Sequence, residues 1–282
     1  MSRMRQALHG LIEFLLARTR RGSEEYPKLF CLAGDHIGDH IFIHGLYERD
    51  LLEGLFDDVL KPLKDRFSET TCLDVGANIG NHTLFLSGRF REVLSFEPNR
   101  LFAAAVRLNT QFNGVENVKI HETGLSDENQ TLIYAMRKDS LGESHFIENG
   151  DADSGIPLEV RRGDDVVGAN GPDISLIKID VEGHEYKAIK GLSETIKRCA
   201  PIVLFESIAE RDSDKVEPTI GLLRELGLRH IYSYEAPHNP YSNKIMKAGY
   251  RLIAGYQRRL APIEANESST NCLLLIASPN PL

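Results

Sequence analysis

The 282-residue sequence contains no tryptophan and only four cysteines, Cys31, Cys72, Cys199 and Cys272. The cysteines are far apart and form no CxxC pair, so neither a zinc site nor a disulfide framework is indicated. A reduced, cytoplasmic compartment fits this cysteine usage best. The sequence also lacks an apolar run near the roughly 20 residues that span a bilayer. Basic residues are not in excess, because the formal net charge is −8. With no general positive field, we expect no nucleic-acid partner.

The N-terminal residues 1–21 have basic ends and an apolar middle. His9 and Glu13 interrupt the apolar part and no small-residue cleavage site follows, which argues against a signal peptide. The apolar residues fall on one helical face: Leu8, Leu11, Ile12, Leu15 and Leu16. We expect an amphipathic helix that packs on the domain or on a second subunit of a homodimer. The alternative is peripheral contact with an anionic membrane surface.

The apolar fraction of 41% is enough for one large domain with appendages. We divide the chain into an N-terminal extension, residues 1–65, and a main domain, residues 66–282. In the extension, residues 24–45 mix short apolar runs with glycine and aspartate, which predicts a strand or two rather than a helix. Residues 47–63 then show a helical pattern that closes near Pro62.

From about residue 71 the chain alternates between short apolar runs and helical patterns. The order strand, helix, strand, helix, strand indicates an α/β fold with a mostly parallel sheet and helices on both faces. This is a Rossmann-like, doubly wound architecture. The alternation lapses at about 130–167 and at 236–271, which we interpret as insertions.

The first strand of this pattern runs into the sequence LDVGANIGN, where glycines allow the backbone to approach a ligand closely. The loop is not a P-loop, because no lysine follows the last glycine. The second strand ends on Glu97, about 23 residues after Asp74, where such folds place an acid that binds both ribose hydroxyls. A nucleoside ligand is therefore expected. Asn78 counts against NAD, because it occupies a position that a pyrophosphate needs to be bare.

Six ordered segments carry a resemblance to a known family: LDVGANIGNHTLFLS, SFEPN, GLSD, LEVRRGDDV, IKIDVEGHEYKAIKGL and PIVLFE. They resemble the signature of the FkbM-type methyltransferases, a branch of the class I S-adenosylmethionine-dependent enzymes. The upstream segment HGLYERDLLEGLF is also similar to that family, and the likeness covers about residues 35–207.

The resemblance implies roles for individual residues. The cofactor S-adenosylmethionine would contact the glycine loop, the end of the second strand and the loop after the third: Asp74, Gly76, Ala77, Asn78, Gly80, Asn81, His82, Glu97, Pro98, Gly124, Leu125, Ser126 and Asp127. Three residues would face the methyl group and the acceptor as catalytic residues: Asp180, Glu182 and His184. Tyr47 and Glu48 would line the acceptor pocket.

An alcohol acceptor is a poor nucleophile until it loses its proton. A carboxylate or an imidazole can take the proton, or a divalent cation such as Mg²⁺ can lower the pKa of the hydroxyl. The segment DVEGHE contains the parts for either route, and Asp164 and Asp165 could complete a metal site with Asp180. The alternative for Asp164 and Asp165 is that they open a short helix. Glu182 and Glu185 could likewise only charge a helix start.

His36, His40 and His44 form a second group, spaced by four residues. On a strand, neighbouring members would lie about 13 Å apart, too far for one ion. On a helix the spacing would suit a metal, but Gly34, Gly38 and Gly45 argue against a helix. Packing, or lining of the acceptor pocket, is the expected role.

The sequence thus predicts an S-adenosylmethionine-dependent methyltransferase that acts on a hydroxyl of a sugar, glycolipid or natural product. One alternative is a non-catalytic nucleoside-binding or scaffold protein on the same fold. Another is an NAD-dependent sugar-modifying enzyme, which would also use Glu97.

Overall fold

The computed structural model describes residues 26–32, 34–135, 145–146, 155–206, 209–235, 258–263 and 274–282, together with Leu11. Apart from Leu11, the amphipathic helix expected over residues 1–21 lies outside the described residues. So do large parts of the two expected insertions. No helix in the part of the chain that the structure describes is both long and apolar enough to cross a membrane.

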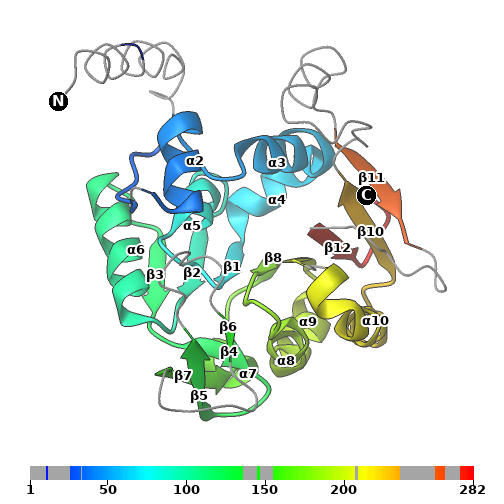
Figure 1. Cartoon of the computed structure of the whole chain (residues 1–282). Coiled ribbons are helices and arrows are strands. Elements are labelled where there is room, and N and C mark those ends of the chain that lie inside the picture. The colour runs from blue at the N-terminus through cyan, green and yellow to red at the C-terminus, as the bar shows by residue number, and fades with distance from the viewer. Residues whose placement is uncertain are drawn as a thin grey trace.

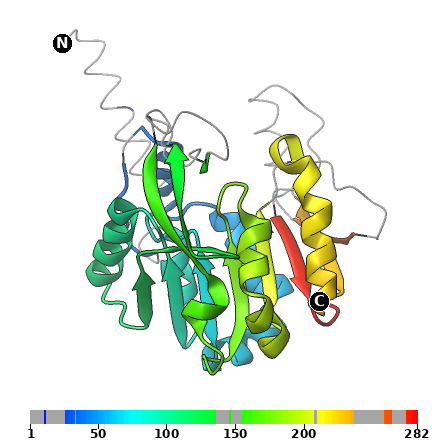
Figure 2. The same cartoon turned by 90° about the horizontal axis from the view of Figure 1, so that it is seen from below.

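A large twisted sheet forms the centre of the molecule (Figures 1 and 2). Its strands run in the order β11-β10-β12-β9-β8-β1-β2-β3, and the five strands from β9 to β3 are parallel. The bounds are β1 Thr71–Val75, β2 Glu92–Phe96, β3 Val118–His121, β8 Ile174–Ile179, β9 Ile202–Glu206, β10 His230–Glu235, β11 Arg259–Pro262 and β12 Leu274–Ser278. This arrangement confirms the predicted doubly wound, mostly parallel sheet.

The strand β12 departs from the parallel pattern. It lies between β9 and β10 and runs antiparallel to both. The strand order reverses between β1 and β8, because β2 and β3 continue on one side of this pair and β9 on the other. Ligands of such sheets bind at this switch point, outside the carboxyl ends of the strands.

Helices cover both faces of the sheet. Their bounds are α2 His36–His44, α3 Arg49–Glu53, α4 Lys64–Glu69, α5 Asn81–Ser87, α6 Arg100–Phe112, α7 Gly163–Val167, α8 Glu185–Gly191, α9 Ser193–Cys199 and α10 Ala209–Glu225. A π-helical turn, Gly54–Val59, and a 3-10 turn, Lys61–Leu63, join α3 to α4. The 3-10 turn contains Pro62, where the sequence predicts the helix to close.

The alternation of side chains along the strands separates two apolar cores. Leu73, Val75 and Ile177 point to the face covered by α8, α9 and α10. Cys72 and Leu176 point to the opposite face, which α3, the π-helical turn, α4 and α5 cover. Because strand side chains alternate with a period of two, Asp74 and Lys178 must share the second face.

A second, four-stranded sheet lies at one edge of the molecule (Figure 1). Its order is β4-β7-β5-β6, with bounds β4 Gly124–Ser126, β5 Gln130–Ala135, β6 His145–Phe146 and β7 Ile156–Arg162. Its strands β5, β6 and β7 lie within the first expected insertion, 130–167, whereas β4 precedes that segment.

The prediction of a strand over residues 24–45 is wrong for 36–44, which form the helix α2. Gly45 ends the helix in the left-handed region, with φ of 81°, and Gly34 precedes it at 82°. Gly38 lies inside the helix, where an added Cβ would sit 1.9 Å from the Leu32 carbonyl oxygen. Gly34 and Gly45 thus flank the helix, and Gly38 permits a close contact. The sequence pattern alone does not distinguish these glycines from turn residues that flank a strand.

Candidate active site

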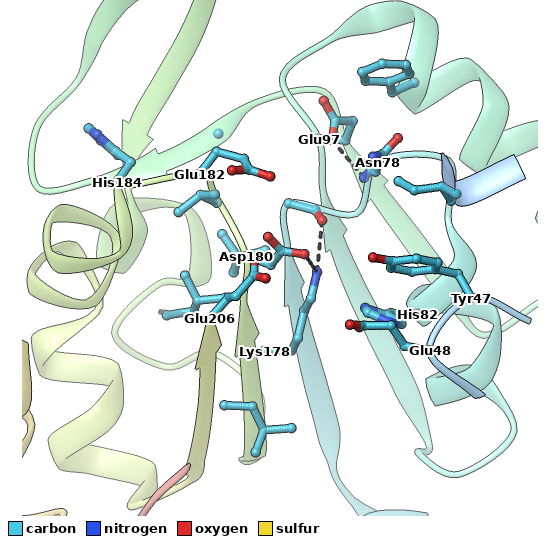
Figure 3. A pocket seen from close by; sticks show the side chains of 18 of the residues that line it. Tyr47, Glu48, Asn78, His82, Glu97, Lys178, Asp180, Glu182, His184 and Glu206 are labelled. Carbon is cyan, nitrogen blue, oxygen red and sulfur yellow. Dashed lines mark hydrogen bonds and ion pairs between the residues drawn. The ribbon is translucent and has the colours of Figure 1, made fainter. Parts of the chain in front are cut away.

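A cavity of about 550 Å³ opens beside the carboxyl ends of β1, β2, β8 and β9. Its volume is within the range of pockets that bury a drug-sized ligand. Its wall is formed by the glycine loop after β1, the end of β2, β4, the segment after β8, the end of β9 and residues 47–56 (Figure 3). The cavity therefore lies at the switch point of the sheet.

The loop after β1 is held against β2 by its backbone. The amides of Gly76 and Ala77 both donate to the Phe96 carbonyl oxygen, over 3.0 and 3.1 Å. Gly76 has φ of +82°, and a Cβ built on it would lie 1.9 Å from the Asp180 carbonyl oxygen. Only glycine fits here, because the loop after β1 and the segment after β8 touch at this point.

Glu97 ties the glycine loop to the end of β2. Its two carboxylate oxygens accept from the backbone amides of Asn78 and Asn99, each over 2.9 Å. The side chain is buried yet lines the cavity. Burial raises its pKa to about 7, although both backbone hydrogen bonds oppose the shift. Each oxygen keeps a second acceptor position, which suits contact with a diol.

The predicted cofactor residues separate into a wall and a support. Seven of them line the cavity: Gly76, Asn78, His82, Glu97, Pro98, Gly124 and Leu125. The other six are not part of its wall: Asp74, Ala77, Gly80, Asn81, Ser126 and Asp127. These six residues lie outside the cavity wall, and their contact with the cofactor stays a prediction.

The supporting residues have identifiable partners. Asn81 accepts from the Tyr47 amide over 2.9 Å and donates to the Tyr47 carbonyl oxygen over 3.0 Å. Gly80 has φ of 88° and precedes α5. Asp127 pairs with Lys190 over 2.8 Å.

Asn81 fixes Tyr47 and Glu48 beside the cavity, whose wall includes both residues, and their contact with an acceptor stays a prediction. Glu48 Oε2 lies 3.4 Å from His82 Nε2. Burial raises the pKa of Tyr47 strongly, and the nearby acids Glu48 and Glu206 raise it further. The Tyr47 hydroxyl is therefore neutral at ordinary pH.

Lys178 joins the two sides of the site from within β8. The register pairs it with Asp74 on β1, so the two side chains lie side by side on one face. Its Nζ lies 3.3 Å from Asp74 Oδ1 and 3.5 Å from Asp180 Oδ2, and donates to the Gly76 carbonyl oxygen over 3.0 Å. Burial lowers its pKa, but Asp74 and Asp180 outweigh burial and raise it above the usual value.

Asp74 itself is fully buried. Its Oδ2 accepts from the Thr83 hydroxyl over 2.6 Å, while its Oδ1 faces the Lys178 ammonium. A buried carboxylate needs such partners. Asp74 is therefore the ionic partner of Lys178 and lies outside the cavity wall.

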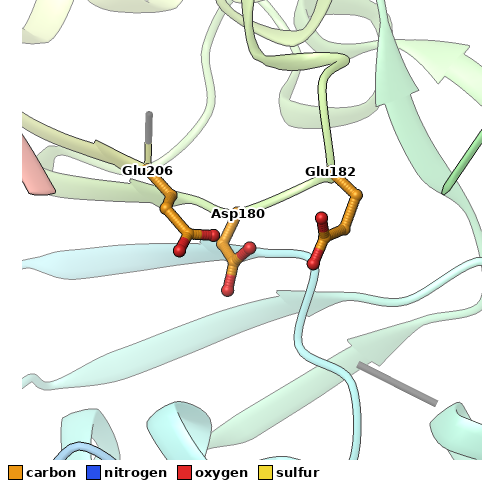
Figure 4. A group of neighbouring side chains, drawn as sticks. All are labelled: Asp180, Glu182 and Glu206. Atoms are coloured by element: carbon orange, nitrogen blue, oxygen red, sulfur yellow. The ribbon is translucent and has the colours of Figure 1, made fainter. Parts of the chain in front are cut away.

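Three carboxyl groups meet at the carboxyl ends of β8 and β9. The register pairs Ile179 with Phe205, so the next residues, Asp180 and Glu206, lie side by side where these two strands end. One oxygen from each of Asp180, Glu182 and Glu206 lies within 4.8 Å of the others (Figure 4). All three residues line the cavity. We call them the acid cluster.

The protonation of the acid cluster is uneven. Burial raises the pKa of Asp180, but Lys178 and His82 outweigh burial and lower it below its usual value. Burial and the charge of Asp180 raise the pKa of Glu206 to about 10. The structure thus favours a charged Asp180 beside a neutral Glu206.

His184 lines the cavity, but its ring does not face the acid cluster (Figure 3). Its Nε2 lies 3.0 Å from the Ser126 hydroxyl, which ties the loop after β8 to β4. Glu185 begins α8 and accepts from the amides of Val181 and Gly183 over 3.3 and 3.0 Å. Of the two acids that could serve a helix start, Glu185 does so and Glu182 faces the cavity.

Asp164 and Asp165 do not join Asp180, so the structure corrects the expectation of a metal site formed by these three residues. Asp164 Oδ1 accepts from the Thr195 amide and hydroxyl over 2.9 and 2.8 Å, and its Oδ2 from the Glu194 amide over 3.1 Å. It therefore caps the start of α9. Asp165 pairs with Arg162 over 3.6 Å. Both residues also belong to the short helix α7, as the alternative interpretation expected.

The three histidines share one face of α2. The rings of His36 and His40 lie 4.5 Å apart and those of His40 and His44 lie 5.6 Å apart. Within the described part of the chain, only the acid cluster brings three possible ligand atoms close enough to hold an ion. His36 reaches the cavity wall, and burial lowers the pKa of His40, helped by its two histidine neighbours.

Backbone strain is concentrated at the cavity. Among the described residues, four besides glycine have positive φ: Glu48, Asn78, Glu182 and Ala200. The first three line the cavity. Such conformations cost free energy and cluster at functional sites.

Comparison with known proteins agrees with this geometry. Residues 74–234, more than half of the chain, match the methyltransferase FkbM domain. The chain belongs to the FkbM methyltransferase family. The matched segment begins at Asp74 in β1 and ends in β10, so it contains most of the FkbM site described above.

Two curated relatives share modest identity with the chain. Methyltransferase 1 of Beauveria bassiana is 27% identical over 144 residues, which are 43% of this chain and 58% of that protein. The hexuronic acid methyltransferase AglP of Haloferax volcanii is 27% identical over 143 residues, 50% of this chain and 57% of that protein. The chain thus matches just over half the length of each.

A solved structure, the methyltransferase FkbM of Methylobacillus flagellatus, is 18% identical, with a TM-score of 0.45. The likeness covers 74% of this chain and 44% of that one.

The sequence reasoning missed two residues of the FkbM site, Lys178 and Glu206. A signal for each was present. Lys178 is a lone cation in an otherwise apolar strand, two residues before an acid, and Glu206 ends the next parallel strand. Polar residues at the ends of neighbouring parallel strands converge.

Proposed function

We propose that the chain is an enzyme that transfers a methyl group from S-adenosylmethionine to an oxygen, on a hydroxyl of a sugar, glycolipid or natural product. The observation that carries this proposal is the cavity at the switch point of the sheet. It places a glycine loop and Glu97 on one side and the acid cluster on the other. The hexuronic acid methyltransferase among the relatives supports a carbohydrate acceptor.

The residues present fit the cofactor. Gly76 and Gly124 leave no space for a side chain beside the cavity, since a Cβ on Gly124 would sit 2.9 Å from Val160 Cγ1. Glu97 would hold the ribose hydroxyls, and Asn78, Pro98 and Leu125 would lie along the nucleoside. When bound, S-adenosylmethionine supplies a methyl group on a sulfonium centre that an oxygen nucleophile can attack in line.

Asp180 is the proposed base. Its side chain is about one-third exposed to the cavity and is kept charged by Lys178. An acceptor hydroxyl that donates to Asp180 is oriented for attack and can leave its proton on the carboxylate. Glu182 lies close enough to accept from a neighbouring hydroxyl.

We favour a base over a divalent cation as the activating group. The Lys178 ammonium already lies 3.5 Å from Asp180 and supplies positive charge to the acid cluster. The candidate residues Asp164 and Asp165 are engaged elsewhere. The remaining catalytic candidate, His184, would act mainly by holding the loop after β8 through Ser126.

Calorimetry and turnover test the proposal. The wild-type chain is expected to bind S-adenosylmethionine and S-adenosylhomocysteine, and a chain that binds neither would exclude the enzyme function. Asp180→Ala is expected to lower turnover by at least about 100-fold, the scale of a general base. Its cofactor affinity should change little.

The two alternatives make different predictions. A non-catalytic nucleoside-binding protein would bind the cofactor and release no S-adenosylhomocysteine with any hydroxyl acceptor, in wild type and variant alike. An NAD-dependent enzyme would bind NAD, for which Asn78 in the glycine loop is unsuited.

A further inference from the structure

We infer that Glu206 is a positioning residue that keeps a proton at neutral pH and donates it in a hydrogen bond to the Asp180 carboxylate. The inference deepens the proposed function, on which it rests, because it assigns a partner to the proposed base. Neither the family match nor the sequence motif assigns a role to Glu206. The measurement below needs neither cofactor nor acceptor, so it can fail independently of the proposed function.

The geometry favours a shared proton. One carboxyl oxygen of Asp180 and one of Glu206 lie within 4.8 Å of each other on the wall of the same cavity. Two carboxylates that share a site repel each other, so the pKa of one is raised, and the group that keeps its proton can donate it to the other. The positions of the strands make this contact unavoidable, because Asp180 and Glu206 follow the paired residues Ile179 and Phe205.

The surrounding charges decide which group keeps the proton. Lys178 Nζ lies 3.5 Å from Asp180, and His82 also favours the charged form of that carboxyl. The largest charge effects on Glu206 come from three acids: Asp180, Glu182 and Glu48. Tyr47 nearby stays neutral. Asp180 therefore ionises first, and a second negative charge on Glu206 would face three acids without a cation of its own.

The proton on Glu206 has a structural consequence. With Lys178 on one side and Glu206 on the other, two donors fix the Asp180 carboxylate. Its orientation is then set before the acceptor arrives, which saves the cost of ordering it during binding. The proton also reduces the negative charge of the acid cluster without an ion.

The test is carbon-13 NMR of the whole chain labelled at the glutamate carboxyl carbon. Between the pKa of Glu97, about 7, and that of Glu206, about 10, one glutamate resonance is expected at the position of a neutral carboxylic acid. This resonance should disappear in Glu206→Gln and persist in the matched variant Glu182→Gln. An acid resonance that survives in Glu206→Gln would overturn the inference.

Two further measurements keep the inference falsifiable if Glu206→Gln does not fold. Asp180→Asn removes the neighbouring negative charge, so the same resonance should titrate at a pH at least about one unit lower. Unchanged titration would count against the shared proton. Addition of Mg²⁺ to the wild-type chain should leave this resonance in place. If the resonance disappeared, a bound cation would have displaced the proton, and the inference would be rejected.

A functional readout separates positioning from simple packing. The amide of Glu206→Gln can still donate to Asp180, whereas Glu206→Ala cannot. We expect cofactor affinity within about twofold of wild type in both variants. S-adenosylhomocysteine release should be largely retained in Glu206→Gln and fall at least about tenfold in Glu206→Ala, the worth of a hydrogen bond to a charged group. Equal loss in both variants would contradict the positioning role.

Discussion

At the scale of single residues, Lys178 carries the charge balance of the site. It is 12% exposed and lies between a fully buried carboxylate, Asp74, and the proposed base, Asp180. Buried ion pairs contribute little net stability, yet removing one partner leaves the other charge buried and uncompensated. The ion pair therefore matters mainly because it prevents an uncompensated charge in the sheet interior, and less because it adds net stability.

Lys178→Met is expected to lower the free energy of unfolding by about 3–5 kcal/mol, because Asp74 loses its cation in the sheet interior. Urea denaturation measures the change. Lys197→Met is the matched control, since Lys197 is 55% exposed and pairs with Glu194 over 3.7 Å. It should change the stability by less than about 1 kcal/mol. Equal effects of the two substitutions would contradict the assigned role of Lys178.

The raised pKa of Glu97 makes a second prediction at this scale. Below pH about 7 the side chain is protonated and offers fewer acceptors to the ribose hydroxyls. Cofactor affinity should therefore rise as pH increases through about 7, by roughly tenfold, the worth of one hydrogen bond to a charged group. Calorimetry across this range measures it, and Glu97→Gln should remove the rise. A pH-independent affinity in the wild type would refute the role of Glu97.

The same group affects stability in the opposite direction. The folded pKa of Glu97 is raised, so the folded chain holds a proton that the unfolded chain releases near pH 4.5. The contribution of Glu97 to stability is thus full below about 4.5 and declines as pH rises to about 7. Ionised Glu97 favours the proposed ligand at some cost to the fold.

Residue types alone could predict part of the site. Glu97 and Asp180 follow apolar strands, and strand ends at a switch point are where ligands bind. The support roles of Asp74, Ser126 and Asp127 were beyond the sequence, because distance along the chain does not show which residue faces the cavity. Lys178 was missed because a lone lysine in a strand gains its meaning only from the register with Asp74.

At the scale of elements, the loop after β1 depends on a contact with the segment after β8. Gly76→Ala would combine a strained φ with a Cβ only 1.9 Å from the Asp180 carbonyl oxygen. Gly114→Ala is a matched control, since Gly114 has φ of +65° and open space around it. Strain alone costs somewhat more than about 1 kcal/mol.

We expect Gly114→Ala to lose only the stability that the strained φ costs, and to bind the cofactor with the affinity of the wild type. Gly76→Ala should lose several times as much stability and bind S-adenosylmethionine at least about tenfold more weakly. Urea denaturation and calorimetry give the two quantities. If both variants behaved alike, the contact between the two loops would not govern the site.

Elements with strong local patterns were predicted well, and those defined by packing were not. The strands β1, β2, β8 and β9 are short apolar runs bounded by polar residues, and they formed as expected. The sequence predicted a strand in place of helix α2, because glycines at these positions are ordinary signals of turns between strands. Glycine fits at position 38 because the Leu32 backbone passes against it, a contact that the periodicity of the sequence does not show.

At the scale of the whole molecule, the cavity has an excess of negative charge. Among the described residues, the carboxylates of Glu48, Asp180 and Glu182 face it beside the neutral Glu206, against the single ammonium of Lys178 on that side. Like charges brought together in a low-dielectric site are strongly unfavourable. A neutral polyhydroxyl acceptor should therefore be preferred over one that bears a carboxylate, in contrast to the hexuronic acid in the name of the Haloferax volcanii relative.

This preference can be measured with paired acceptors that differ only in a carboxylate near the reacting hydroxyl. We expect kcat/KM for the neutral member to be higher by at least about tenfold, which corresponds to about 1.4 kcal/mol. Glu182→Gln should narrow the difference, because it removes one repelling charge. A preference for the acidic member would show that the cavity charges do not select the acceptor.

The position of β12 has a consequence for how the chain is made. The strands β10 and β11 pair with each other, yet in the described part of the sheet β10 joins the parallel strands through β12, which is synthesised after both. During translation the exposed edge of β9, next to Glu206, must therefore wait for Leu274–Ser278 before it is covered. The acid cluster reaches its final surroundings only with this last strand, so the nascent chain cannot complete its site before the sheet is closed.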